Sequence, residues 1–248
     1  MPVSDAMLKP LFALLLAFGP ASGAAKADTP LEGAILPYRQ VEVSPPVASR
    51  ILELKVGEGD PVKEGQPLAI LYGKLEELEM QRAKVLLDRR EFEAKSAKRL
   101  YESRIIPETK AMESRVELDL ARMQYETAAE QVRLRTILSP IDGVVVARRR
   151  EVGETVSTSE PIFRILDLSR VWVVCAMEPK LASGLAQGQK VVVRIPQMHD
   201  ARSFEGTVSL VNPCAEASGL VRVKVLVENP EHQIRSGLKA WVSLSPAK

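Results

Sequence analysis

The spacing of apolar residues changes twice along the chain after its first 27 residues. Between residues 40 and 72, short apolar runs are separated by Gly and Pro, which is typical of strands and turns. Between residues 73 and 136 the apolar residues recur every seven positions, and only one Gly and one Pro occur, which indicates long helices. From residue 137 onward the β-type pattern returns. This order predicts a mainly β protein with an α-helical insertion.

The two β-rich segments on either side of the insertion resemble each other at an offset of 94 residues. The identical pairs are Pro46 and Pro140, Gly59 and Gly153, Val62 and Val156, and Pro67 and Pro161. Each segment is predicted to form a strand, a Gly-centred turn and a second strand, with Pro where no ladder N–H is needed. Neither segment has enough residues to bury its own apolar face. We therefore expect the two halves to pack face to face as one small β-sandwich.

The insertion is predicted to be an antiparallel coiled-coil hairpin. In the first helix the residues repeating every seven positions are Met80, Leu87, Ala94 and Tyr101, and in the second they are Ala111, Leu118, Tyr125 and Val132. Pro107 is suited to the first turn of the second helix. The connection is short, so the helices should pack side by side. About 30 residues at ~1.5 Å each give an arm of roughly 45 Å.

A second apolar stripe on the first helix is formed by Leu78, Val85 and Phe92, which also repeat every seven residues but on another face. One stripe is sufficient for the partner helix of the hairpin. The second stripe therefore suggests packing against a neighbouring chain. Because a hairpin leaves and re-enters a fold at one place, it can interrupt a β-module without disturbing the pairing of its halves.

The sequence predicts a signal peptide at the start of the chain and a small β-barrel at its end. Residues 1–27 have the features of a signal peptide, namely Lys9, the apolar stretch Leu11–Phe18 and an Ala-x-Ala site ending at Ala27. Eight apolar residues are too few to span a bilayer, which needs ~20. We expect export and cleavage, with an uncleaved anchor as the alternative. Residues 167–248 contain short strands, turns and one short helix, which predicts a small β-barrel.

Composition and motifs argue against several functions. The formal net charge of +2 is too small for nucleic-acid binding, and aromatic residues make up only 4% of the chain. No Gly-x-Ser-x-Gly, phosphate-loop or His-Glu-x-x-His motif occurs in the sequence. Asp142, in "SPIDG", is interpreted as a turn residue. We therefore predict a protein that is not an enzyme and that uses no cofactor.

Two further chemistries remain as alternatives. Cys175 and Cys214 could form a disulfide in an oxidising compartment, or they could be two buried free thiols. Met198 and His199, with either cysteine, offer ligands suited to Cu(I), although ordinary structural roles explain them as well. A lipoyl or biotinyl carrier needs a Lys at a tight turn, whereas Lys74 is predicted to open a helix.

The whole arrangement resembles the periplasmic adaptor family, also called membrane fusion proteins, of tripartite efflux pumps and type I secretion systems. The resemblance is carried by "VASRILELKVGEGDPVKEGQPL", "ILSPIDGVVVARRREVGETVSTSEPIFRILDLSRVWV", "GLAQGQKVVVRI" and "FEGTVSLVNP". It implies a lipoyl-like (barrel-sandwich hybrid) domain split between residues 40–72 and 137–166. It further implies a hairpin at 73–136, a β-barrel at 167–248 and, before them, an extended segment at 28–39.

The resemblance also implies partners. A ring, commonly of six subunits, is expected to bridge an inner-membrane transporter and an outer-membrane channel, with the hairpin tip as the channel contact. The residues expected at the tip are Arg99, Leu100, Arg104, Ile105, Ile106 and Pro107. Relatives carry an Arg, a Leu and a Ser there. In this chain Arg99 and Leu100 are adjacent, and Pro107 takes the Ser position.

The class of transporter follows from the two ends of the chain. Many members of the family have a membrane-proximal domain built from both termini, which we expect to be reduced or absent here. We favour an RND-type pump over an ABC transporter because the N-terminus resembles a cleaved signal.

Ile105 and Ile106 are apolar at an exposed turn, which suggests a docking contact. The alternative is that they cover the core of the hairpin.

Overall fold

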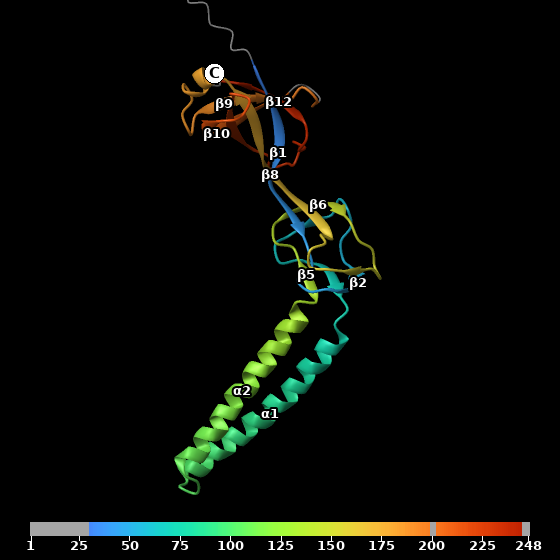
Figure 1. The fold of residues 1–248 in the computed structure, drawn as a ribbon, viewed down its shortest axis with the longest axis vertical. Helices are drawn as coiled ribbons and strands as arrows, with labels where there is room; N and C mark the ends of the chain where they lie inside the picture. Colours follow the sequence, from blue (N-terminus) through green and yellow to red (C-terminus); the bar gives the residue numbers. More distant parts are fainter. Residues whose placement is uncertain (1–29, 199–201, 245–248) are drawn as a thin grey trace, which may run out of the picture.

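The computed structural model of the protein describes residues 30–198 and 202–244. The expected signal peptide at 1–27 and His199 lie outside these residues. A β-barrel, a lipoyl-like domain and a helical hairpin follow one another along the long axis of the molecule (Figure 1). The predicted fold class, mainly β with a split lipoyl-like sandwich, an inserted coiled-coil hairpin and a small barrel, is confirmed.

Six strands close the barrel in the order β1, β12, β9, β10, β11, β8 and back to β1. They are β1 (Leu31–Val43), β8 (Phe163–Met177), β9 (Lys190–Arg194), β10 (Ser203–Ala215), β11 (Val221–Glu228) and β12 (Lys239–Ser243). A single turn of helix, α3 (Pro179–Ala182), follows β8. Inward-facing Val and Ile residues alternate along each strand and fill the interior, as in β11, whose burial alternates over its whole length.

The expected boundaries of the barrel are corrected at its N-terminal side. The sequence pattern predicts a barrel at residues 167–248, and the family resemblance implies a separate extended segment at 28–39. In the structure Ile35 is fully buried in the barrel core, and β1 pairs with both β8 and β12. The pairing partners of β1 lie more than a hundred residues away along the chain. The local alternation of apolar and polar residues in β1 does not reveal pairing partners that lie so far away in the sequence.

The lipoyl-like domain contains six short strands and the second half of β1 together with the first half of β8. The short strands are β2 (Ser49–Leu54), β3 (Pro61–Val62), β4 (Pro67–Leu71), β5 (Thr136–Leu138), β6 (Gly143–Arg148) and β7 (Thr155–Val156). The predicted repeat is visible in the pairing, because β2 of one half pairs with β7 of the other and β6 pairs with β3. The equivalent turn residues Gly59 and Gly153 share a left-handed conformation, with φ of 91° and 93°.

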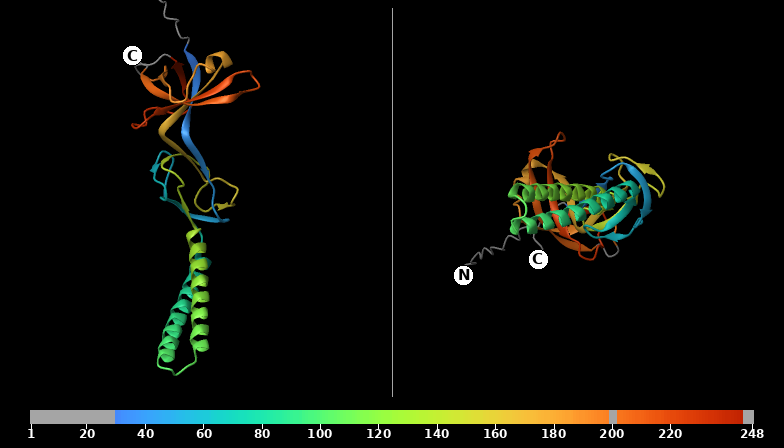
Figure 2. Two further views of the ribbon diagram at one scale, coloured as in Figure 1. Left: turned by 90° about the vertical axis from the view of Figure 1, so that its left-hand side faces the viewer. Right: turned by 90° about the horizontal axis from the view of Figure 1, so that it is seen from below.

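The hairpin consists of α1 (Lys74–Glu102) and α2 (Glu108–Arg133), which cross at a shallow angle (Figure 2). Its seam is formed mostly by small side chains. The buried residues are Ala83, Leu87 and Ala97 on α1 and Ala121 and Ala128 on α2. Small residues let the two backbones approach closely. Tyr101, expected in the seam, is instead 42% exposed near the tip, where the helices end.

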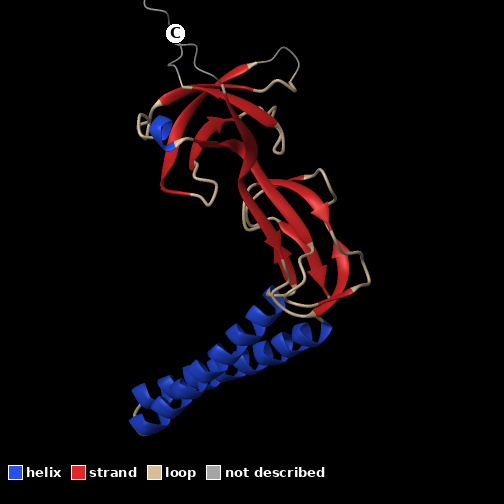
Figure 3. Cartoon of the chain, turned by 45° about the horizontal axis from the view of Figure 1, so that its top comes forward, coloured by secondary structure: helices blue, strands red, loops and turns tan. Residues whose placement is uncertain are grey.

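The base of the hairpin is held by one arginine. Arg135 lies where the chain re-enters the sandwich, and its Nη2 is 2.5 Å from Oε1 of Glu76 on α1. Its Nη1 also donates to the carbonyl oxygen of Tyr72. A side chain at Gly73 would collide with Arg135, since a Cβ there would lie 2.6 Å from its Cγ. The two crossings between the sandwich and the hairpin lie at the same end of the hairpin (Figure 3). Arg135, in the second crossing, contacts Tyr72 and Glu76 at the first one.

Only β1 and β8 connect the barrel to the lipoyl-like domain, at a narrowing that we call the waist (residues 37–39 and 167–171). Here Tyr38 alone stands opposite three residues of β8, so the ladder has a bulge.

Buried Asp167 accepts hydrogen bonds from Arg39 Nε at 3.0 Å and from the Ser169 hydroxyl at 2.6 Å. Burial opposes the ionisation of Asp167, but the bonds from Ser169 and Arg39 outweigh it and hold the pKa of the carboxyl below its usual range.

We predict that Asp167→Asn lowers the free energy of unfolding at pH 7 by about 2 kcal/mol, because Arg39 and Ser169 lose a charged acceptor. A depressed native pKa adds stability above the unfolded pKa, roughly 3.9, that is lost as the pH falls through the native value. The difference between the two proteins should therefore be constant above about pH 5 and shrink below pH 4. Urea unfolding across this range measures it. Glu178→Gln, at an exposed carboxylate, is the control and should show no such difference.

Candidate functional site

The hairpin tip is a helix-terminating turn of defined geometry. After α1 ends, Arg104 takes a left-handed conformation with φ of 58°. The Arg104 N–H donates to the carbonyl of Tyr101, and the Ile105 N–H donates to the carbonyl of Leu100, each at 2.8 Å. This pair of bonds is a Schellman motif, in which the left-handed position is usually Gly. The sequence did not reveal this motif, because the expected Gly is an Arg.

All six residues expected at the tip lie together in the structure. Arg99 and Leu100 are in the last turn of α1, and the connection runs from Arg104 to Pro107, the N-cap of α2 rather than its first residue. The two isoleucines differ: Ile105 is 67% exposed, whereas Ile106 is half-buried. Ile105 is therefore the most exposed apolar side chain of the tip, ahead of Leu100 and Tyr101, which are 40% and 42% exposed.

The outer edges of the hairpin carry large apolar side chains. On α1 the predicted second stripe is exposed, with Val85 at 70% and Phe92 at 73%. Val85 and Phe92 are two residues before and five residues after buried Leu87, so they point away from α2. A matching stripe on α2, missed in the sequence analysis, contains Met112, Val116 and Met123. Its members point away from α1 by the same argument, because Ala121 and Ala128 face inward.

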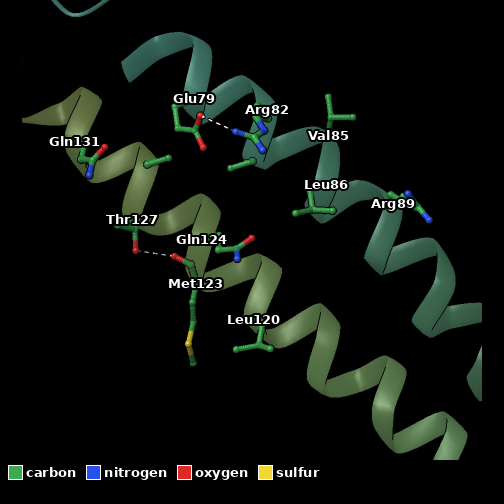
Figure 4. Close-up of a pocket in the computed structure, with 12 residues that line it drawn as sticks. Glu79, Arg82, Val85, Leu86, Arg89, Leu120, Met123, Gln124, Thr127 and Gln131 are labelled. Atoms are coloured by element: carbon green, nitrogen blue, oxygen red, sulfur yellow. Dashed lines mark hydrogen bonds and ion pairs between the residues drawn. The ribbon is translucent and has the colours of Figure 1, made fainter. Parts of the chain in front are cut away.

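One face of the hairpin between these edges is a shallow groove of about 800 Å³. Leu86 of α1 and Leu120 of α2 line it, and Val85 and Met123 lie at its two rims (Figure 4). A hydrogen-bonded ion pair also joins the two helices, with Arg90 Nη1 2.8 Å from Oε2 of Glu117. The hairpin therefore combines a polar link between its helices with apolar edges that have no partner within the described part of the chain.

Both cysteines are free, so the prediction that Cys175 and Cys214 could form a disulfide is wrong. Cys175 lies in β8 and Cys214 at the end of β10, with β11 between these strands. Residues separated by an intervening strand lie about 10 Å apart, beyond the ~7 Å limit for a disulfide. Cys175 is buried, and burial raises the pKa of its thiol to about 11. The alternative of two buried thiols is also wrong for Cys214, which is exposed.

Met198 and Lys74, the other residues considered for binding chemistry, are explained by their places in the fold. Met198 packs against the barrel core, while its expected companion His199 lies outside the described residues. Within residues 30–198 and 202–244, no group of three or more His, Cys, Asp or Glu residues is placed to hold a metal ion. Lys74 is the first residue of α1 and lies 3.4 Å from Glu77, so it is not at a strand turn. No helix in the described part of the chain is long and apolar enough to cross a membrane.

Comparison with known proteins agrees with this architecture. The family model of the CzcB-like barrel-sandwich hybrid domain matches residues 39–167, and that of the CusB-like β-barrel domain, of the RND type, matches residues 170–248. The chain is 25% identical over 224 residues to the cobalt-zinc-cadmium resistance protein CzcB of Cupriavidus metallidurans, covering 83% of this chain and 42% of that protein. It is also 25% identical over 221 residues to the nodulation protein NolF of Rhizobium meliloti, covering 83% and 60%.

Among solved structures, a MacA–MexA chimeric protein containing the MexA α-hairpin domain of Pseudomonas aeruginosa is similar in fold. Its TM-score is 0.77 at 24% identity, over 88% of this chain and 81% of that chain. Fold, domain order and both family models define an adaptor-type chain with an inserted hairpin. The chain belongs to the periplasmic adaptor, or membrane fusion protein, family. It spans about half the length of the curated relatives that it matches.

We predict that Arg104→Gly stabilises the end of α1 by about 1 kcal/mol, because glycine adopts a left-handed conformation without the steric cost that arginine bears. Hydrogen exchange of the amides of residues 101–105 should slow accordingly. Ser103→Gly is the matched control, since Ser103 has an ordinary φ of −82° and should gain nothing. Unchanged or faster exchange in Arg104→Gly would show that the arginine side chain stabilises the tip by contacts of its own.

Proposed function

We propose that the protein is a periplasmic, non-catalytic adaptor that links an inner-membrane transporter of the RND type to an outer-membrane channel. The observation that carries this proposal is the exposed apolar tip at the far end of a rigid arm. Helix α1 has 29 residues, which at ~1.5 Å each extend the arm by roughly 43 Å. Ile105 lies where solvation favours polar residues, so a partner surface is the better environment for it.

The direction of the arm supports this assignment of the partners. The first and last described strands, β1 and β12, begin and end in the barrel, and the hairpin tip is at the opposite pole (Figure 2). The resemblance to the adaptor family implies that the hairpin tip contacts the channel, so the barrel pole would be the one nearer the inner membrane. The barrel would then face the transporter, and the tip would face the channel.

The two apolar edges of the hairpin favour a ring of identical subunits. The edges differ in sequence, with Phe92 on α1 and Met123 on α2, and they lie on opposite sides. A contact between unlike edges of two copies is heterologous, and repeating it closes a ring when the rotation permits. In the proposed assembly, six subunits bring their hairpins together as a tube with the Ile105 side chains at its end.

Two other functions remain as alternatives. An adaptor of an ABC transporter or type I secretion system would have the same hairpin and sandwich, and is distinguished only by its transporter. A periplasmic Cu(I)-delivery adaptor would need Met198, His199 and a cysteine to converge. Cys175 is buried, which weighs against it as the thiol ligand, so the exposed Cys214 is the remaining candidate. One of the two relatives is named for resistance to cobalt, zinc and cadmium, and the name of the other gives no cargo, so no cargo is proposed.

The function is tested by crosslinking the tagged protein in living cells and identifying its partners after purification from envelopes. We expect wild-type protein to recover both a transporter and a channel. Ile105→Asp should lose the channel and keep the transporter, with the melting temperature unchanged because Ile105 is exposed. The control Leu181→Asp, an exposed apolar residue of α3, should keep the channel. Recovery of neither partner by the wild type would exclude the adaptor role.

The ring is tested with Phe92→Asp and Met123→Asp in separate proteins. Phe92→Asp disrupts the α1 edge and keeps the α2 edge, and Met123→Asp does the reverse. Because the contact needs one edge of each kind, neither variant should self-associate. An equimolar mixture should form dimers through the two intact edges. Sedimentation or native mass spectrometry measures the species. If Met123→Asp alone forms dimers through its α1 edge, the contact is between like edges, and a ring built from unlike edges is wrong.

A further inference from the structure

A crevice at the waist has a charge balance that the adaptor role does not explain. Its volume is about 750 Å³, which is within the range of ligand sites. The lipoyl-like domain contributes Lys63 and Asp142, the waist contributes Arg39, Asp167 and Arg170, and a barrel loop contributes His232. The crevice therefore lies between the two β domains and contains charged groups of both signs.

The acidic groups of the crevice already have partners. Asp167 accepts hydrogen bonds from both Arg39 and Ser169, which occupy its two oxygens. Asp142, predicted to be a turn residue, accepts the Glu64 N–H at 2.8 Å and thereby ties together the turns of the two sandwich halves. Arg39 is neutralised by Asp167. Among the residues that line the crevice, Asp142 therefore supplies the one remaining negative charge, against the two positive charges of Lys63 and Arg170.

Two cations in the crevice have no such partner. Within the described ranges, neither Lys63 nor Arg170 has a carboxylate within 4.0 Å. The Arg170 guanidinium instead lies 3.8 Å from the centre of the Tyr38 ring. That ring stacks on Trp172, with the ring centroids 5.6 Å apart. A stacked guanidinium keeps its charge and its in-plane N–H donors, and its orientation is fixed in advance.

The backbone around Arg170 is equally well fixed. Buried Asn229 donates from its side chain to the carbonyl of Leu168 at 2.8 Å, and its backbone N–H donates to the carbonyl of Ser169 at 2.9 Å. These bonds satisfy carbonyl groups that the bulge removes from the ladder. Arg170 therefore projects from a fixed position in strand β8, where its backbone is paired with Glu228 of β11. Many surface arginines of this chain instead form ion pairs with neighbouring glutamates, as Arg133 does with Glu130.

We propose that the waist crevice binds a carboxylate, held in a bidentate contact by Arg170 and by Lys63 as a second cation. A planar guanidinium fork matches a carboxylate in geometry as well as in charge. Lys63 belongs to the lipoyl-like domain, and Arg170 is paired with Glu228 of the barrel strand β11, so one bound carboxylate would tie the two domains together. The carboxylate can come from an acidic protein segment or from a small polycarboxylate, and the two sources share this recognition chemistry.

The test is an NMR titration of the purified ¹⁵N-labelled protein with citrate and, separately, with a tetraglutamate peptide at matched ionic strength. We expect saturable shifts of amides in the crevice, with at least tenfold weaker binding in R170Q and in K63Q. K63Q leaves the stack of Arg170 on Tyr38 intact, so it separates loss of charge from loss of structure. R122Q, in the hairpin, removes the same kind of charge elsewhere and should bind as the wild type does.

The two ligands distinguish the source. Saturation by the peptide alone supports an acidic protein segment, saturation by citrate alone supports a small polycarboxylate, and saturation by both supports a site that selects the carboxylate group itself. The proposal is overturned if neither ligand gives saturable shifts at millimolar concentration, or if the shifts are the same in the wild type, R170Q and K63Q.

Discussion

The ladder between β1 and β8 is the interaction on which the rest of the molecule depends. In its first part, from Gly33 to Pro37, it closes the barrel, and from Arg39 to Val43 it forms one layer of the lipoyl-like domain. Its partners are more than a hundred residues apart, so a long loop must close before either domain is complete. The hairpin contributes its 64 inserted residues, 73–136, to that loop, yet its helices fold locally and return the chain to its starting point. The Arg135 contact with Glu76 holds that return.

The hairpin is unusual in where it puts its large side chains. Alanines form most of the buried seam, while Phe92 and Met123 face outward. An alanine seam buries little apolar area, and burial is worth roughly 25 cal/mol per Å², so an isolated hairpin gains little from its own packing. The apolar area that would stabilise it lies on the edges. In the proposed ring, neighbouring copies would cover these outward stripes and thereby add to the stability of the hairpin.

The sequence predicted what local patterns encode. The heptads located both helices, and α1 begins at Lys74 as expected. The repeated Pro and Gly positions revealed the split sandwich, because Gly59 and Gly153 are required by the same turn geometry. The membership of β1 in the barrel was missed, since its partners are distant in sequence. The stripe on α2 was missed because only Val116 and Met123 are seven residues apart, while Met112 and Val116 are separated by four. The crevice at the waist depends on a three-residue bulge, which brings Arg170 onto Tyr38 and has no signature in the sequence.

In the proposed arrangement the hairpin tip contacts the outer-membrane channel, and the barrel faces the inner membrane. The most direct measurement places a photoreactive amino acid at position 105 in living cells and identifies the crosslinked protein by mass spectrometry. The same amino acid at position 181, in the barrel, reports on the opposite pole. We expect an outer-membrane channel protein at position 105 and a transporter at position 181. A transporter crosslinked at position 105, or a channel at position 181, would contradict it.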